Sequence, residues 1–99
     1  MVVSGQLGLV DGALVHGGVR AEVTQALANM AGLLKSQGAS MKSVVKTTVF
    51  LRHMSDYAVM NEAYVEAFGD HRPARAAVAV ADLPLGGLVE IEAWAFAPG

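Results

Sequence analysis

The first long hydrophobic pattern in the chain has the three- and four-residue spacing of an amphipathic helix. It runs from Val19 to Gln37, and its apolar stripe is Val23, Ala26, Leu27, Met30 and Leu34. Gly38 stands where a helix commonly ends, and Lys35 in the last turn complements the helix dipole. Gln25 and Asn29 fall outside the stripe, so we expect solvent around both side chains.

A second stretch with helical spacing follows Ser55 or Asp56, either of which is a favourable N-cap residue. Its predicted buried stripe is Tyr57, Met60, Tyr64, Ala67 and Phe68. Gly69 follows the last of these residues, and Pro73 prevents the helix from continuing further. The pattern therefore predicts a second amphipathic helix that ends at Gly69.

Alternating and β-branched residues predict strands on either side of the first helix. One strand begins at Met1 and runs toward Leu9, and Gly5 inside it indicates a bulge or a group lying close to the backbone. The alternative is a plain kink at the end of the strand, which the sequence alone favours. The other spans Ser43 to Arg52. Alternation gives this strand two partly apolar faces, formed by Val45, Thr47, Val49 and Leu51 and by Val44, Lys46, Thr48 and Phe50. We therefore expect both of its faces to be covered.

The last quarter of the chain, Pro73 to Phe96, is predicted to form a hairpin of two strands joined by a Leu-Pro-Leu-Gly-Gly turn. The small side chains at 76–81 would let another sheet approach closely. The order is strand, helix, strand, helix, strand, strand. This order predicts an α+β fold, a two-layer sandwich with both helices on one face of a sheet. We expect residues 1–99 to form one domain.

Composition adds an expectation about assembly, because the chain is unusually apolar for its size. Hydrophobic residues make up 54 % of the 99 positions and charged residues only 16 %, against about 25 % charged in typical domains. A domain this small has too little interior to bury that much apolar surface. We therefore expect a homo-oligomer whose subunits cover one another.

Charge and residue types exclude several classes of function. The formal net charge is −2 and there is no basic run, which argues against nucleic-acid binding. The absence of cysteine excludes disulfides, thiolate catalysis and Cys-ligated zinc. The longest apolar run, 76–81, is far shorter than the ~20 residues of a membrane span, and no signal peptide is recognisable. We expect a soluble, cytoplasmic protein.

Two charged residues in the last quarter are the candidates for chemistry. Arg75 stands in an Ala/Val strand and Glu90 in an alternating Val-Glu-Ile-Glu-Ala run. A guanidinium between apolar walls binds a small carboxylate well, and a neighbouring glutamate could position a water molecule. The alternative is a structural ion pair between the two residues.

Other kinds of site have little support in the sequence. The three histidines, His16, His53 and His71, lack the spacing of metal ligands. There is no nucleotide-binding or nucleophile motif. We therefore expect neither a metal nor a cofactor.

Several short motifs follow one another along nearly the whole chain. They are SGQ (4–6), TQALANM (24–30), VVKTTVFL (44–51), PAR (73–75), LP (83–84) and VEIEA (89–93). No single motif is specific, but the ordered set resembles the RidA family, also called the YjgF/YER057c/UK114 family.

The resemblance implies a chorismate-mutase-like fold, a mixed sheet with two helices on one face, assembled as a trimer with sites between subunits. It implies a 2-iminobutanoate/2-iminopropanoate deaminase that hydrolyses 2-imino and 2-enamino acids. Arg75 would clamp the substrate carboxylate and Glu90 would position water. Gly5 and Ala77 would also contact the substrate.

The sequence also departs from the family pattern. Ala76 and Ala77 stand where the family usually has Ser and often Cys, and the usual N-terminal segment with its edge strand is expected to be missing. One alternative is a non-catalytic protein that binds a small keto or amino acid. An RNA-cleaving role, also attached to the family, is disfavoured by the charge.

Overall fold

A computed structural model describes residues 1–96 of the chain. Its two helices are α1 (Gly18–Ser36) and α2 (Tyr57–Phe68). The strands are β1 (Val2–Gln6), β2 (Leu9–Val10), β3 (Ala13–Leu14), β4 (Val44–Leu51), β5 (Ala74–Ala79) and β6 (Val89–Ala95). Single turns of 3₁₀ helix lie at Met41–Ser43, Met54–Asp56 and Pro84–Gly86.

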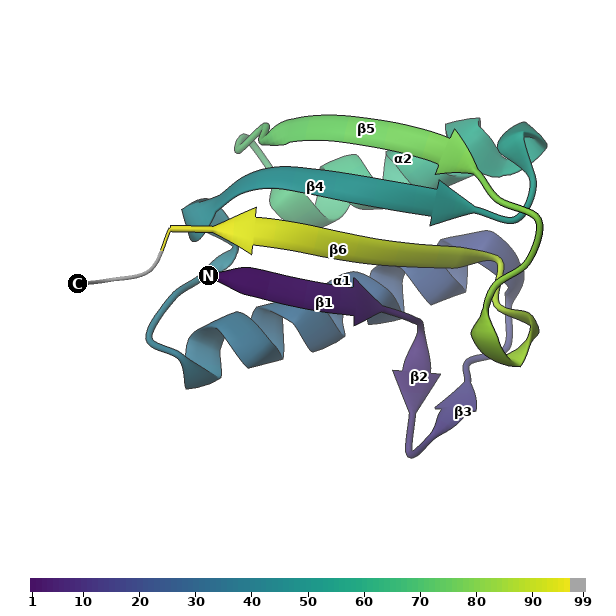
Figure 1. The fold of residues 1–99 in the computed structure, drawn as a ribbon, viewed down its shortest axis with the longest axis horizontal. Coiled ribbons are helices and arrows are strands. Elements are labelled where there is room, and N and C mark those ends of the chain that lie inside the picture. Colours follow the sequence, from purple (N-terminus) through teal and green to yellow (C-terminus); the bar gives the residue numbers. More distant parts are fainter. Residues whose placement is uncertain (97–99) are drawn as a thin grey trace.

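The main sheet has four strands in the order β1-β6-β4-β5. Strands β4 and β5 are parallel, whereas β6 runs antiparallel to both β1 and β4. Both helices cover the same face of this sheet, and the small β2–β3 hairpin extends beyond the end of β1 (Figure 1). The predicted α+β fold, a mixed sheet with two helices on one face, is confirmed.

The predicted hairpin between the last two strands is wrong, because β4 lies between β5 and β6. The β4-α2-β5 crossover places β5 parallel to β4 at one side, and β6 pairs with the other side. The connection from β5 to β6 passes around the end of β4. There the Val80 N–H donates to the Leu51 carbonyl, and the Arg52 N–H donates to the Leu88 carbonyl.

A β-bulge changes the predicted faces at the start of β4. The register with β6 shifts between Val44 and Lys46. Val44 is therefore fully buried under the helices, whereas Val45 is exposed. The predicted alternation had placed Val45 with Thr47 and Val44 with Lys46, the reverse of what is observed. The reason is that a bulge adds one residue to the strand and so reverses the alternation before it. From Thr47 onward the predicted alternation holds.

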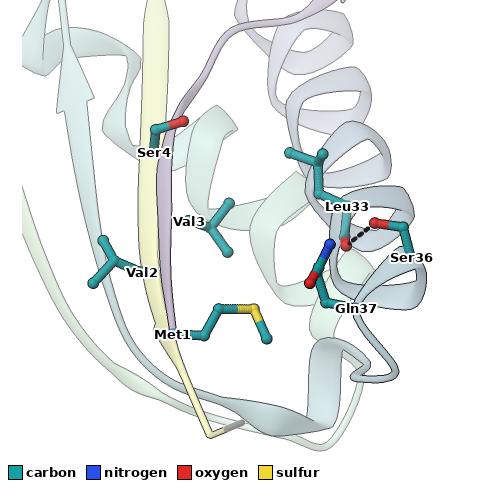
Figure 2. Close-up of a pocket in the computed structure, with 7 residues that line it drawn as sticks. All are labelled: Met1, Val2, Val3, Ser4, Leu33, Ser36 and Gln37. Atoms are coloured by element: carbon teal, nitrogen blue, oxygen red, sulfur yellow. Dashed lines mark hydrogen bonds between the residues drawn. The ribbon is translucent and has the colours of Figure 1, made fainter.

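Strand β1 forms one edge of the sheet beside α1. Figure 2 shows Met1 and Val3 pointing toward the helix and Val2 pointing the opposite way. A cavity of about 310 Å³ lies there, lined by Met1 to Ser4 and by Leu33, Ser36 and Gln37. Its lining side chains carry no titratable group, and none of them is a predicted site residue.

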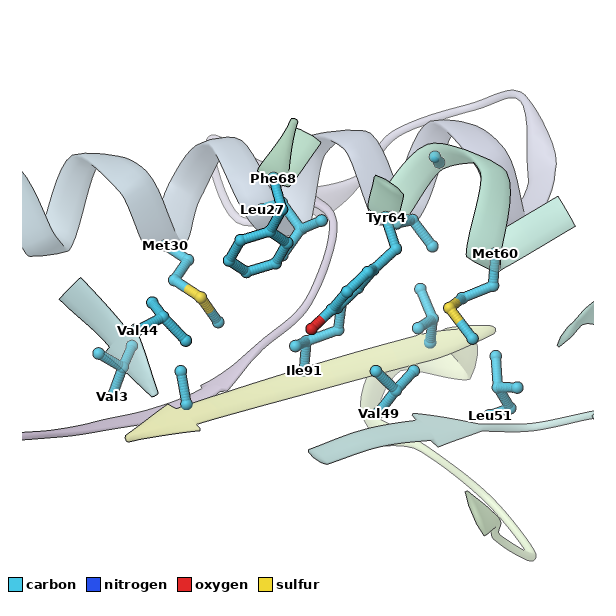
Figure 3. Close-up of a cluster of buried hydrophobic side chains, with 14 of the residues drawn as sticks. Val3, Leu27, Met30, Val44, Val49, Leu51, Met60, Tyr64, Phe68 and Ile91 are labelled. Atoms are coloured by element: carbon cyan, nitrogen blue, oxygen red, sulfur yellow. The ribbon is translucent and has the colours of Figure 1, made fainter. Parts of the chain in front are cut away.

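The core lies between the helices and the sheet (Figure 3). Its largest fully buried side chains are Leu27, Met30, Leu34, Leu51, Met60 and Ile91. The stripe predicted for α1 is buried throughout. In α2 the prediction is right for Met60, Tyr64 and Phe68, but Tyr57 and Ala67 are exposed and Ala63 is buried instead.

The face of the sheet away from the helices is apolar and open. Register places Val2 beside Trp94 and Phe50 beside Val78 on this face. Val2, Val78 and Trp94 are all exposed large hydrophobic residues. The prediction that β4 is covered on both faces is therefore not met by residues 1–96 alone.

No helix of the described residues is long and apolar enough to cross a membrane.

The packing gives a direct test of the core. We expect Leu27→Ala to lower the free energy of unfolding by about 2–5 kcal/mol, because it removes buried methyl groups and leaves a cavity. The matched control is Leu33→Ala in the same helix, where the side chain is 46 % exposed. Its effect should stay within about 1 kcal/mol. Urea denaturation measures both, and equal losses would contradict this assignment of the core.

Candidate functional site

Arg75 lies on β5 and is held by α2. Its Nη1 donates a hydrogen bond to Asn61 Oδ1 at 2.7 Å, and its Nη2 donates to Tyr57 Oη at 2.6 Å. The guanidinium carbon lies 4.7 Å from the centre of the Tyr64 ring. Arg75 pairs with Thr47 of β4, whose side chain is buried on the helix side. Arg75 therefore points to the helix-covered side of the sheet.

These three partners of Arg75 lie on one side of α2 because they are spaced four and three residues apart. Tyr64 is itself fixed, since its hydroxyl forms a buried hydrogen bond of 2.7 Å with the hydroxyl of Thr47. The guanidinium has more N–H donors than the two hydrogen bonds to Asn61 and Tyr57 use. Arg75 is only half-buried, so the remaining donors are available to a carboxylate. We call Arg75 with Tyr57, Asn61 and Tyr64 the arginine half-site.

Glu90 lies on β6 with its side chain on the open face of the sheet. Its neighbours Val89 and Ile91 are fully buried on the helix side, and Glu90 pairs with Phe50 of β4. Glu92, two residues further on, shares the open face by alternation. Both glutamates are half-buried.

Gly5 lies directly beneath the carboxyl group of Glu90. A methyl group at Gly5 would lie 2.7 Å from the Glu90 carboxyl carbon and 2.8 Å from its Oε1. The register of β1 shifts between Val3 and Gln6, so Gly5 sits in a bulge. Gly5 therefore has both a bulge and a close approach, and the plain strand-end kink that the sequence alone favoured is wrong. We call Gly5 with Glu90 the glutamate half-site.

The two half-sites do not meet within the chain. Arg75 and Glu90 pair with different positions of β4, Thr47 and Phe50, and lie on opposite sides of the sheet. The expectation that they stand on neighbouring strands is wrong, because β4 separates β5 from β6. Among the ion pairs of residues 1–96 there is none between Arg75 and Glu90, so the structural pair is not formed within one chain.

Ala77 follows Arg75 on the same side of β5 and packs against the core, whereas Ala76 is on the other side. Neither side chain offers a polar group. A ligand beside Arg75 would therefore meet only backbone N–H and carbonyl groups at these two positions.

Several polar contacts around these half-sites were not predicted from the sequence. Tyr57 and Asn61 were not predicted to hold Arg75, although their spacing on a helix was visible. Asn29, predicted to be solvated, donates hydrogen bonds to the carbonyls of Leu7 and Leu9 and accepts one from Gln25. That prediction was wrong because the chain after β1 folds over this side of α1.

Metal binding has no structural support in the described part of the chain. No three His, Asp or Glu side chains of residues 1–96 lie close enough together to hold a metal ion. His71 instead forms a hydrogen bond of 2.7 Å between its Nε2 and the carbonyl of Val44.

Comparison with known proteins places the chain in a family. Residues 1–97 match the family model described as Endoribonuclease L-PSP. The chain belongs to this family. The human 2-iminobutanoate/2-iminopropanoate deaminase is 48 % identical over 93 residues, which cover 92 % of this chain and 68 % of the human protein.

Solved structures give the same family. RidA from the Antarctic bacterium Psychrobacter has a TM-score of 0.88 at 42 % identity, covering 93 % of this chain and 76 % of that one. Escherichia coli TdcF, solved with bound serine, has a TM-score of 0.91 at 31 % identity, covering 98 % and 80 %. The resemblance to the RidA family is therefore confirmed.

In this RidA-family chain, burial raises the pKa of Tyr64, and this effect is larger than the opposing effects of the Thr47 hydrogen bond and the Arg75 charge. The unfolded chain therefore loses the phenolic proton at lower pH than the folded chain. The contribution to stability is complete below the unfolded pKa of about 10 and is lost as pH rises through the folded value.

We expect the difference in unfolding free energy between wild type and Tyr64→Phe to fall as pH rises from about 8 to 11. Denaturant titrations at each pH measure it, and the other titrating groups cancel in the difference. A difference that stays constant over this range would contradict the assigned shift.

The contact between Gly5 and Glu90 predicts the effect of a single methyl group. We expect Gly5→Ala to displace the Glu90 carboxylate while changing the unfolding free energy by about 1 kcal/mol or less, because the clash falls on the end of a flexible side chain. A crystal structure shows the side chain and denaturation gives the energy. A Glu90 carboxylate that stays in place would contradict the close contact. The control is Gly32→Ala in α1, where no atom lies within 4 Å of an added methyl group, and it should leave Glu90 in place.

Proposed function

We propose that this RidA-family protein hydrolyses 2-imino acids, and their 2-enamino tautomers, to 2-keto acids and ammonia. The observation that carries the proposal is the fixed guanidinium of Arg75, which is hydrogen-bonded to Tyr57 and Asn61 and still half-exposed. The human relative, named as a deaminase of two such imino acids, is 48 % identical.

The arginine half-site is suited to a small carboxylate. A guanidinium offers parallel N–H donors in a planar fork that match the two oxygens of a carboxylate. Asn61 and Tyr57 hold the fork in one orientation, so little conformational freedom is lost when the substrate binds. The 2-imino acids carry a carboxylate next to the reacting carbon. Clamping the carboxylate therefore also places that carbon.

A second copy of the chain completes the site in this proposal. Strand β5 is at the edge of the sheet, so the arginine half-site can face the open side of a neighbouring sheet. The exposed Val2, Val78 and Trp94 on that open side support such a contact. An interface between two different surfaces repeats head to tail, and it forms a closed ring when the rotation from copy to copy closes. We propose a trimer, in which the arginine half-site of one copy meets the glutamate half-site of the next.

The reaction in this site is an addition of water followed by loss of ammonia. Glu90 holds the water and accepts its proton while the water oxygen bonds to the imine carbon. Glu90 passes this proton to the nitrogen, which gives a carbinolamine with one hydroxyl and one amino group. The hydroxyl proton then moves to the nitrogen through Glu90, the oxygen forms the C=O bond as the carbon–nitrogen bond breaks, and ammonia leaves the 2-keto acid. General base catalysis of this kind contributes about 10²–10⁴-fold. The backbone of Gly5 and of Ala77 would line the substrate on its two sides.

A second candidate is binding of a small amino or keto acid without turnover. The specific observation in its favour is the serine bound to Escherichia coli TdcF, a relative of the same fold. The carboxylate clamp of Arg75 serves this function equally well. The two candidates differ in whether Glu90 matters, because a binding protein needs the clamp but no base.

The test generates an imino acid in situ with an amino-acid oxidase and follows the fraction that semicarbazide traps. We expect wild type to suppress the trapped signal. Arg75→Lys should lower kcat/KM by about 10²-fold or more, because the ammonium lacks the planar fork. Glu90→Gln should lower kcat by about 10²-fold or more while ligand binding persists.

Each variant has a matched control elsewhere in the chain. Arg52→Lys changes an exposed arginine whose partner is Asp82 at 3.7 Å, and Glu92→Gln changes a glutamate on the same sheet face as Glu90. Both controls should stay within about twofold of wild type. Wild type that leaves the trapped signal unchanged but binds 2-ketobutyrate through Arg75 would favour the second candidate and contradict hydrolysis.

A further inference from the structure

Helix α1 carries a buried carboxylate that the proposed reaction does not use. Glu22 is only 5 % exposed. Its Oε1 accepts a hydrogen bond of 2.8 Å from the backbone N–H of Leu88. It takes part in none of the ion pairs found within residues 1–96. A buried carboxylate without a cation is costly, so its presence calls for a local reason.

Glu22 lies where the chain leaving β1 meets the chain entering β6. A methyl group at Gly8 would lie 2.7 Å from both the Cα and the carbonyl oxygen of Glu22. A methyl group at Gly87 would lie 3.1 Å from the Leu7 side chain and 3.7 Å from Glu22 Oε1. The backbone of α1 at Glu22 is thus in contact with one segment, and its side chain holds the other.

Asn29 binds the first of these segments further along α1. Its Nδ2 donates to the carbonyl of Leu9 at 2.9 Å and to that of Leu7 at 3.3 Å. Gln25 donates to Asn29 Oδ1 at 2.8 Å, which fixes the orientation of the amide. One face of α1 therefore anchors both segments through side-chain hydrogen bonds to backbone groups.

The two anchored segments carry the two members of the glutamate half-site. Gly5 lies two residues before Leu7, and Glu90 lies two residues after Leu88. Both backbone groups of Leu88 are in use, because its N–H donates to Glu22 and its carbonyl accepts from Arg52. Any shift at Leu88 therefore moves the start of β6 and the base of the Glu90 side chain.

We propose that Glu22 is a positioning residue for the proposed reaction, and that it acts with Asn29 to keep the Glu90 carboxylate over Gly5. The inference rests on the proposed function, since it assigns to Glu22 the placement of the proposed base. A base displaced by about 1 Å can lose two orders of magnitude in rate. Glu22 itself is not expected to touch the substrate.

The experiment compares Glu22→Met, Glu22→Gln and a matched Glu62→Met on the exposed surface of α2. Glu22→Met keeps a similar volume but loses the acceptor for the Leu88 N–H, so kcat should fall roughly 10- to 100-fold, with KM within about twofold. Glu22→Gln keeps an acceptor oxygen and should stay within about threefold of wild type. Glu62→Met should match wild type. All rates are taken well below each variant's Tm.

Amide hydrogen exchange and crystal structures add readouts that do not depend on turnover. In Glu22→Met, exchange at Leu88 should accelerate and the Glu90 carboxylate should leave its place over Gly5. A Glu22→Met protein with wild-type kcat would overturn the proposal. So would a Glu22→Gln protein as slow as Glu22→Met, because the hydrogen bond would then not be what matters.

A different result identifies failure of the proposed function itself. If wild type shows no turnover, the hydrolysis proposal fails, and the crystal structures alone decide the role of Glu22. Displacement of Glu90 in Glu22→Met, but not in Glu22→Gln, would then support the positioning role. An unmoved Glu90 in both variants would overturn it.

Discussion

Strand β4 lies between β5 and β6, and this placement determines how the site can be built. It gives β4 a parallel partner on one side and an antiparallel partner on the other. The same placement puts Arg75 on the helix-covered side of an edge strand and Glu90 on the open face of an inner strand. One chain therefore presents two half-sites that cannot reach each other, and in the proposed function a second copy brings them together.

Each half-site is held by a different helix, and the two supports use different contacts. Helix α2 fixes the arginine with an amide, a phenol and an aromatic ring. Helix α1 holds the chain on both sides of the Gly5–Glu90 contact through Glu22 and Asn29. The helices thus do more than cover the sheet. Polar side chains at the margins of their apolar stripes hold Arg75 and the segments that carry Gly5 and Glu90.

Much of the fold could be predicted from the sequence because it depends on local periodicity. The apolar stripe of α1 and the end of α2 at Gly69 each depend on neighbouring residues. The pairing partner of a strand does not. The turn at 83–87 is compatible with a hairpin, and only the pairing of β4 with both later strands excludes it. The bulge at Val45 was hidden for a related reason, since one extra residue reverses the faces without altering the composition.

The candidate site was predictable in its residues but not in its arrangement. Arg75 and Glu90 stood out as charges in apolar strands, and family resemblance gave them roles. Their separation by β4 and the support of Arg75 by Asn61 are contacts between distant parts of the chain. The hydrogen bonds of Glu22 and Asn29 were not predicted. Hydrophobic periodicity predicts a polar helix face to be exposed, even where a loop such as residues 7–9 covers that face.

In the proposed function each site is formed between two copies of the chain, and mixed oligomers of two inactive variants test this arrangement. Arg75→Ala and Glu90→Ala chains, each inactive alone, are unfolded together and refolded as a mixture. If the half-sites come from different copies, a random mixture contains some sites with both residues intact, and about a quarter of wild-type activity returns. If the mixture stays as inactive as its parents although mixed oligomers have formed, the site does not lie between copies and the account is wrong.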